Sequence, residues 1–143
     1  MAENTLIELD SLSANEFKVE LDGQEVQGVF RVSGFKPFDF VNTGNSHSVI
    51  LTRMVQRDAN NPFNKWVRES VSTLGMDVNP TRSLAIVFVD EEVEIRRYTL
   101  NGAYLVGLSY SDLDTSRTEL VEEITTIQYA SVEVKWTATA SLE

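Results

Sequence analysis

The sequence contains no cysteine and a single histidine, His47. Without cysteine the chain has neither disulfides nor thiolate metal ligands, and one imidazole cannot form the histidine clusters that hold zinc. Long apolar runs are also missing, since runs such as residues 84–89 fall far short of the roughly 20 residues that a membrane-spanning helix needs. The sequence therefore excludes a disulfide-stapled protein and predicts no membrane insertion.

The sequence also lacks the usual motifs of catalysis. His47 stands between two serines but outside any G-x-S-x-G sequence, which carries the nucleophile of many hydrolases. Neither glycine-rich phosphate-binding motif, G-x-x-x-x-G-K-[ST] or G-x-G-x-x-G, occurs. The acidic stretch 112–119 lacks the central glycine of a calcium loop and is better explained as a solvated turn. We predict a non-enzymatic protein with no catalytic residue, no metal and no cofactor.

Basic residues are scarce as well. The formal net charge is −10 and the pI is near 4.5. Binding to phosphates depends on Lys and Arg displacing counterions, so this charge argues against a protein that grips nucleic acid. Solubility alone explains an acidic surface, although such a surface would also let a polyanion slide past without sticking. The first residues show no basic or apolar signal region, so we expect synthesis in the cytoplasm.

What the sequence does contain is strand periodicity. In residues 16–21, Phe17, Val19 and Leu21 share one face while charged residues take the other, as in a half-buried strand. At 143 residues the chain fits one domain, with an N-terminal arm (1–15), a β-rich body (16–137) and a C-terminal tail (138–143). The strands are predicted at residues 16–21, 26–32, 48–54, 84–90, 93–100, 104–110, 119–128 and 131–137. Tight turns are predicted at residues 91–92 and 101–102.

One helix and one unusual loop complete the pattern. Asn61 as N-cap, Pro62 as the first helical residue and Gly75 as the stop predict an amphipathic helix over about 62–74. The fold class is then mainly β (α+β): a barrel or sandwich of about eight strands with one flanking helix. The loop 33–46 carries an unusual apolar load for a solvated connection. These side chains pack either on their own core or on a neighbouring subunit: Phe35, Phe38, Phe40 and Val41.

The predicted strand 119–128 does not sort into an apolar and a polar face. Glu119 and Glu123 share a face with apolar residues, and Glu122 joins apolar residues on the other face. Such a strand either crosses a sheet whose burial changes along its length or belongs to a sheet shared between subunits.

The order of these segments resembles the T4-type phage tail-tube family. The opening hairpin, FKVELDG at 17–23 and GVFRVSG at 28–34, is similar to that family's first two strands. Residues 48–53 resemble its third strand, and residues 62–70 with Trp66 resemble its single helix. Residues 84–90, 98–104, 111–114 and 119–134 continue the series. The likeness covers about residues 16–136, but the segment 35–47 lacks the basic and Leu-Pro-Gly-like residues of many members.

The resemblance implies a subunit of the inner tube of a contractile phage tail or a phage-tail-like injection system. Such subunits form stacked hexameric rings around a lumen through which DNA or effector proteins pass. The implied partners are further copies of the chain, a sheath protein, and baseplate, hub and tube-terminator proteins, all within one assembled particle. We expect Phe35, Phe38, Phe40 and Val41 at subunit contacts, and some of Glu119, Glu122 and Glu123 at the lumen.

Two other readings stay open. A tube-initiator or baseplate-hub protein uses the same domain to cap or nucleate a tube, and this sequence does not separate it from a repeating subunit. A monomeric β-barrel binding module would instead show an apolar internal pocket.

Overall fold

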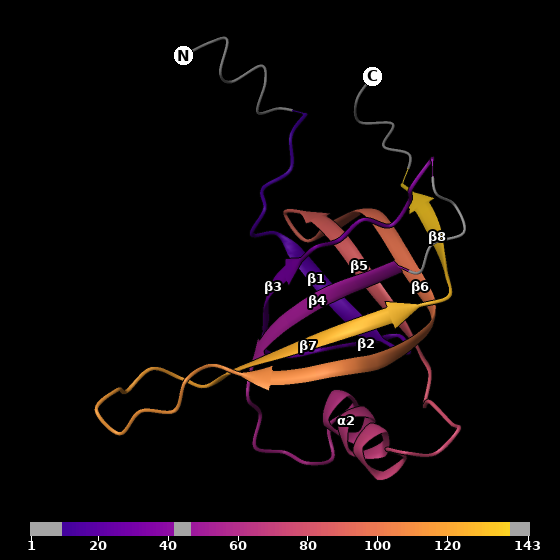
Figure 1. Cartoon of the computed structure of the whole chain (residues 1–143). Coiled ribbons are helices and arrows are strands. Elements are labelled where there is room, and N and C mark those ends of the chain that lie inside the picture. Colours follow the sequence, from indigo (N-terminus) through magenta and orange to yellow (C-terminus); the bar gives the residue numbers. More distant parts are fainter. Residues whose placement is uncertain (1–9, 42–46, 138–143) are drawn as a thin grey trace.

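The computed structural model describes residues 10–41 and 47–137 (Figure 1). Within these residues the chain forms eight strands and one helix, which confirms the mainly β fold class. The elements follow in the order β1 (Phe17–Leu21), β2 (Gln24–Glu25), β3 (Val29–Ser33), β4 (His47–Met54), α2 (Pro62–Ser72), β5 (Arg82–Asp90), β6 (Val93–Tyr110), β7 (Glu122–Tyr129) and β8 (Ser131–Trp136). No helix of the described residues is long and apolar enough to cross a membrane.

The long strand β6 joins two antiparallel sheets that face each other in Figure 1. The first sheet contains β2, β1, β5, the first half of β6, and β8. The second sheet contains the other half of β6, followed by β7, β4 and β3. All strand pairs are antiparallel. The predicted N-terminal arm and C-terminal tail fall largely outside the described residues.

A sharp corner in β6 replaces one predicted turn. The Asn-Gly pair at 101–102 matches a tight-turn signal, but the strand continues through it because its partner, β7 followed by β8, bends at the same level. Gly102 has a φ of 65°, and a Cβ placed there would lie 3.1 Å from the Cβ of Ala130. The prediction of two strands at 93–100 and 104–110 is therefore wrong. Glycine lets one strand serve both sheets.

Other predictions differ from the structure at the ends of elements. The predicted strand 26–32 begins only at Val29, as β3, and the short β2 lies before it at Gln24–Glu25. The predicted strand 119–128 begins only at Glu122. The predicted acidic turn is confirmed, because Glu91 and Glu92 have φ values of 48° and 69° between β5 and β6.

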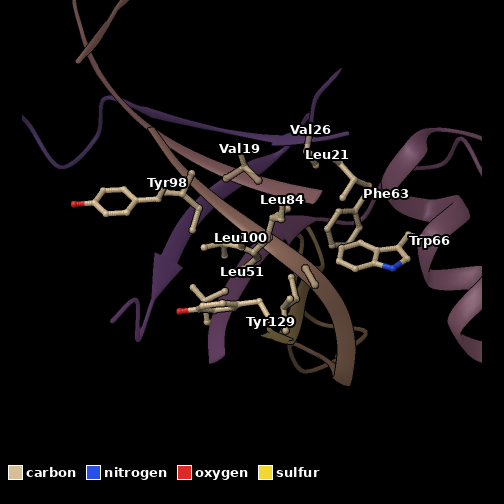
Figure 2. Packing of buried hydrophobic residues seen from close by; sticks show 14 residues of the cluster. Val19, Leu21, Val26, Leu51, Phe63, Trp66, Leu84, Tyr98, Leu100 and Tyr129 are labelled. Carbon is tan, nitrogen blue, oxygen red and sulfur yellow. The ribbon is translucent and has the colours of Figure 1, made fainter. Parts of the chain in front are cut away.

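The core lies between the two sheets and is closed at one end by the helix. Figure 2 shows Phe63 and Trp66 reaching from the helix side toward Leu21. The Trp66 indole nitrogen donates to the carbonyl of Pro80 at 2.9 Å, so burial leaves its polar end paired. At the N-cap, the Asn61 side chain accepts from the backbone N–H of Asn64 at 2.8 Å, as predicted.

Candidate assembly site

The second sheet ends in two strands that are paired on one side only. Within the described residues, β3 pairs with β4 alone, and residues 104–110 of β6 pair with β7 alone. Each edge has one extra residue that shifts its register, Phe30 in β3 and Val106 in β6. Large apolar side chains are exposed along both edges, namely Phe30, Val106, Leu108 and Tyr110. Unpaired strand edges recruit other chains, so both edges are candidate contact surfaces.

The two faces of β7 give its neighbouring glutamates different surroundings. Burial alternates along the strand, and Glu123 lies on the buried face with Thr125 and Ile127. Glu122 is half-buried on the opposite face, where it pairs in register with Met54. The burial of Glu123 does not fit the expectation that this residue borders an open lumen. For Glu122, which lies on the outer face, a position at the lumen stays a prediction.

Glu123 belongs to a buried polar network that the sequence reading did not find. Arg53 of β4 donates from Nε and Nη2 to Glu123 Oε1 at 2.8 Å, and Tyr110 donates to Oε2 at 3.2 Å. The same guanidinium donates to Asn64 Oδ1 and lies over the ring of Phe63, with Cζ 4.3 Å from the centroid. Burial, and then the nearby Glu123 carboxylate, raise the pKa of Tyr110.

A sequence signal for this network did exist. Arg53 follows Val49 and Leu51 at intervals of two, so strand alternation puts a cation on the apolar face of β4. A buried cation needs an anionic partner, but sequence alone does not show which carboxylate of the chain lies opposite it. The network holds the helix against the second sheet.

Glu119 lies in the connection between β6 and β7, residues 111–121, which we call the β6–β7 loop. Its carboxylate forms an exposed ion pair with Arg117 at 3.5 Å. Leu113 and Leu120 of the same loop are strongly exposed. Figure 1 shows the loop reaching well beyond the sheet.

The four predicted contact residues divide into anchors and exposed groups. Phe35 packs against the core and meets Tyr98 edge to face, with centroids 5.3 Å apart. Phe38 lies between Tyr98, at 6.4 Å, and Phe40, at 6.3 Å. Phe40 and Val41 are almost fully exposed. Phe35 is thus an internal anchor, and the side chains free to meet a neighbour are Phe38, Phe40 and Val41.

The main charged cluster lies on the first sheet. Arg97 donates to Glu20 at 2.7 Å and to Glu94 at 2.8 and 3.0 Å. These hydrogen bonds lower the pKa of both carboxyl groups, and the two carboxylates in turn raise the pKa of Arg97. The cluster ties β1 to β6, which are separated by β5.

The surface grooves show no catalytic arrangement. A groove of about 810 Å³ runs beside the helix past Asp22 and Arg82, which form an ion pair. An apolar groove of about 520 Å³ lies between Phe17, Phe30 and Phe88. Among the described residues no group of three or more His, Cys, Asp or Glu side chains could hold a metal ion.

Comparison with known proteins gives the same picture. The family model of the T4-like virus tail tube protein gp19 matches residues 39–133, well over half of the chain. A chain of the sheath–tube complex of an extracellular contractile injection system, PVC, in the extended state has a TM-score of 0.70 at 10% identity, over 96% of this chain and 99% of that chain. The tube-terminating cap of the anti-feeding prophage gives 0.69 at 13% identity, over 89% and 92%.

A more distant structure, Hcp1 from Flavobacterium johnsoniae, gives a TM-score of 0.55 at 9% identity, over 85% of this chain and 96% of that chain. No curated protein matches the chain. At these identities the solved structures show the shared fold, while the family model shows kinship. The chain therefore belongs to the T4-like virus tail tube protein gp19 family and is a structural, non-enzymatic tail-tube protein.

Proposed function

We propose that copies of this chain join edge to edge, β3 of one to the second half of β6 in the next, and close into a ring. Six copies per ring is the number that the family resemblance implies. Rings then stack into a tube that conducts DNA or effector proteins. The observation that carries this proposal is the pair of open edges at the two sides of one sheet.

Strand direction supports this joint. The strands of the second sheet alternate in direction in the order β3, β4, β7, β6. Rotation about a ring axis keeps the direction of every strand, so β6 meets the next copy's β3 antiparallel. The joint continues the pattern within the subunit, and ring closure removes both edges. The extra residues Phe30 and Val106 twist each edge, which favours a complementary partner over indiscriminate pairing.

The lumen in this proposal is lined by the outer face of the second sheet. The opposite face is buried against the core and the helix, so it is not available. Ser48, Glu122, Thr126 and Gln128 lie on the outer face and give it small polar groups and a carboxylate. The Glu122 carboxylate on this face would repel polyanions. A sheath protein would then meet the outside of the tube, and baseplate, hub and terminator proteins its ends.

The experiment that tests the ring uses the absence of native cysteine. Cysteine at Arg31 is combined in turn with cysteine at Tyr104, Gly107 or Ser109, which lie on the same outer face of the sheet as Arg31, so the three pairs scan the unknown register across the joint. Oxidation should give a ladder on a denaturing gel that ends at six copies. A matched pair at Arg31 and Leu74, on the connection after the helix, should give no ladder. Rings in electron micrographs without a ladder from any of the three pairs would refute the proposed joint.

Electron micrographs of the same preparation distinguish a repeating tube subunit from a protein that caps or starts the tube. The terminating cap has nearly the same TM-score as the sheath–tube chain, so the fold does not decide between them. Purified repeating subunits should extend into hollow tubes of uniform diameter. A cap or initiator should stop at single rings, and a binding module should remain monomeric.

A further inference from the structure

Two connections lie at opposite ends of the second sheet. The segment 34–41, which we call the aromatic loop, follows the end of β3 and leads toward the start of β4, where His47 pairs with Tyr129. The β6–β7 loop lies at the other end, where Met54 pairs with Glu122. Figure 1 shows the β6–β7 loop on one side of the barrel and the start of β4 on the other.

These two loops carry most of the strongly exposed apolar side chains. Among the described residues, five large apolar side chains are at least 70% exposed: Phe40 at 90%, Val41 at 87%, Leu113 at 79%, Leu74 at 77% and Leu120 at 70%. Four of the five are in the two loops. Because the loops point away from each other within a subunit, neither can cover the other in the same copy.

Both loops are held in shape before any contact forms. In the β6–β7 loop, the Ser111 backbone N–H donates to the carbonyl of Glu122 at 2.9 Å, and Asp114 Oδ1 accepts from the backbone and hydroxyl of Ser116 at 3.0 and 2.8 Å. The backbone N–H of Val55 ties the far end of the loop through the carbonyl of Val121 at 3.1 Å. Exposed leucines on a pre-shaped loop lose little conformational freedom on docking.

The aromatic loop is equally well anchored. Phe35 and Phe38 both pack on Tyr98, and Phe38 in turn stacks with Phe40. The Asp39 side chain accepts from the backbone N–H of Val41 at 3.0 Å. Phe40 and Val41 are therefore presented outward on a fixed base.

We propose that Leu113 and Leu120 of one copy pack against Phe40 and Val41 of a copy in the adjacent ring. This inference rests on the proposed ring. Strands of a closed barrel tilt by about 35–45° from its axis, so the two ends of the second sheet face the two ends of the ring. Every ring then carries six β6–β7 loops on one face and six aromatic loops on the other. A contact between two different surfaces cannot satisfy itself within a pair of rings, so it extends into a filament.

The charged residues of the two loops also fit a contact between them. The β6–β7 loop holds Asp112, Asp114 and Glu119 against Arg117 as its single cation. In the aromatic loop, Lys36 forms an ion pair with Asp39 at 3.2 Å and keeps most of its side chain exposed. A leucine between two aspartates fits an apolar surface that carries an exposed ammonium at its border.

The test separates ring formation from stacking. The variant Leu113→Ser with Leu120→Ser should keep the thermal melt of the parent subunit and still form rings, but electron micrographs should show no tubes. The control Leu74→Ser removes an equally exposed leucine from the connection after the helix and should leave tubes intact. Phe40→Cys combined with Leu113→Cys in one chain should give an open-ended ladder of crosslinked copies in tubes and no crosslinks in isolated rings.

The possible outcomes distinguish a failure of the stacking contact from a failure of the proposed ring. Normal tubes from the double serine variant, or tubes that never crosslink through the cysteine pair, would overturn the stacking contact and leave the ring proposal standing. Absence of rings from the unaltered chain would overturn the proposed function and this contact with it.

Discussion

The buried pair of Arg53 and Glu123 should dominate the stability of the isolated subunit. Their side chains are only 1% and 6% exposed, with a nitrogen–oxygen distance of 2.8 Å. Glu123→Gln keeps the volume and one acceptor oxygen, but it replaces the other acceptor with a donating amide nitrogen and leaves the guanidinium without a counter-charge. Removing one partner of a buried pair costs about 3–5 kcal/mol. Since domains are stable by about 5–15 kcal/mol in total, this variant should lose a large part of its stability.

Urea unfolding of the monomeric subunit, followed by circular dichroism, measures that loss. At roughly 2–4 °C per kcal/mol for a chain near this size, a loss of 3–5 kcal/mol corresponds to a Tm lower by roughly 6–20 °C. Arg53→Met should be costly for the same reason. The double variant should lose less than the sum of the two, because no unpaired charge remains, with a coupling of about 0.5–3 kcal/mol.

The neighbouring glutamate provides the control. Glu122→Gln alters the same side-chain type one residue away on the outer face and should change stability by no more than about 0.5 kcal/mol. If Glu123→Gln and Glu122→Gln had equal small effects, the ion pair would contribute nothing to the fold, and the assignment of the two faces of β7 would be wrong.

Two further predictions concern the first sheet and the corner. Arg97 lowers the pKa of Glu20 and Glu94 in the folded state, so their contribution is present above the normal carboxyl pKa and is lost as pH falls through the lowered values. Arg97→Gln should therefore weaken the subunit at neutral pH and flatten its loss of stability in acid, as measured by urea midpoints across pH; an unchanged acid profile would contradict this. Gly102→Ala should cost about 1–2 kcal/mol for the left-handed backbone, and more if Ala130 does not move. Gly23→Ala, with a φ of 86° and open space, isolates the backbone part, and equal losses would show that the corner is not tightly packed.

Strand alternation was enough to predict most of the fold, since it depends only on which residues face the core. It failed at residues 101–102, where the local turn signal competes with pairing to β7 and β8 some 30 residues later. Local sequence does not contain that partner. The same limit applies to Glu122 and Glu123. Strand alternation places their side chains on opposite faces of β7 but does not show which of the two faces is buried. Which face is buried depends on Arg53, seventy positions earlier.

The aromatic loop shows a second limit. Phe35 and Phe40 stand in the same Gly- and Pro-containing stretch and have the same side chain, so composition predicts the same role for both. Tyr98, on a distant strand, makes one an anchor and leaves the other exposed. The edges of β3 and β6, which are unpaired within the described residues, could not be predicted from the sequence either. An edge is defined by the absence of a neighbouring strand, which no local pattern shows.

The molecule divides into a part that completes its own core and a part that offers surfaces to the proposed assembly. The first sheet, the helix and the Arg53–Glu123 pair complete a core within the subunit, so folding does not require a neighbour. The second sheet has two edges that no strand covers within the described residues, and four of the most exposed apolar side chains lie in the loops at its ends. A net charge of −10 repels free copies at long range, so in the proposed assembly the matched short-range contacts of edge on edge and loop on loop would bring them together.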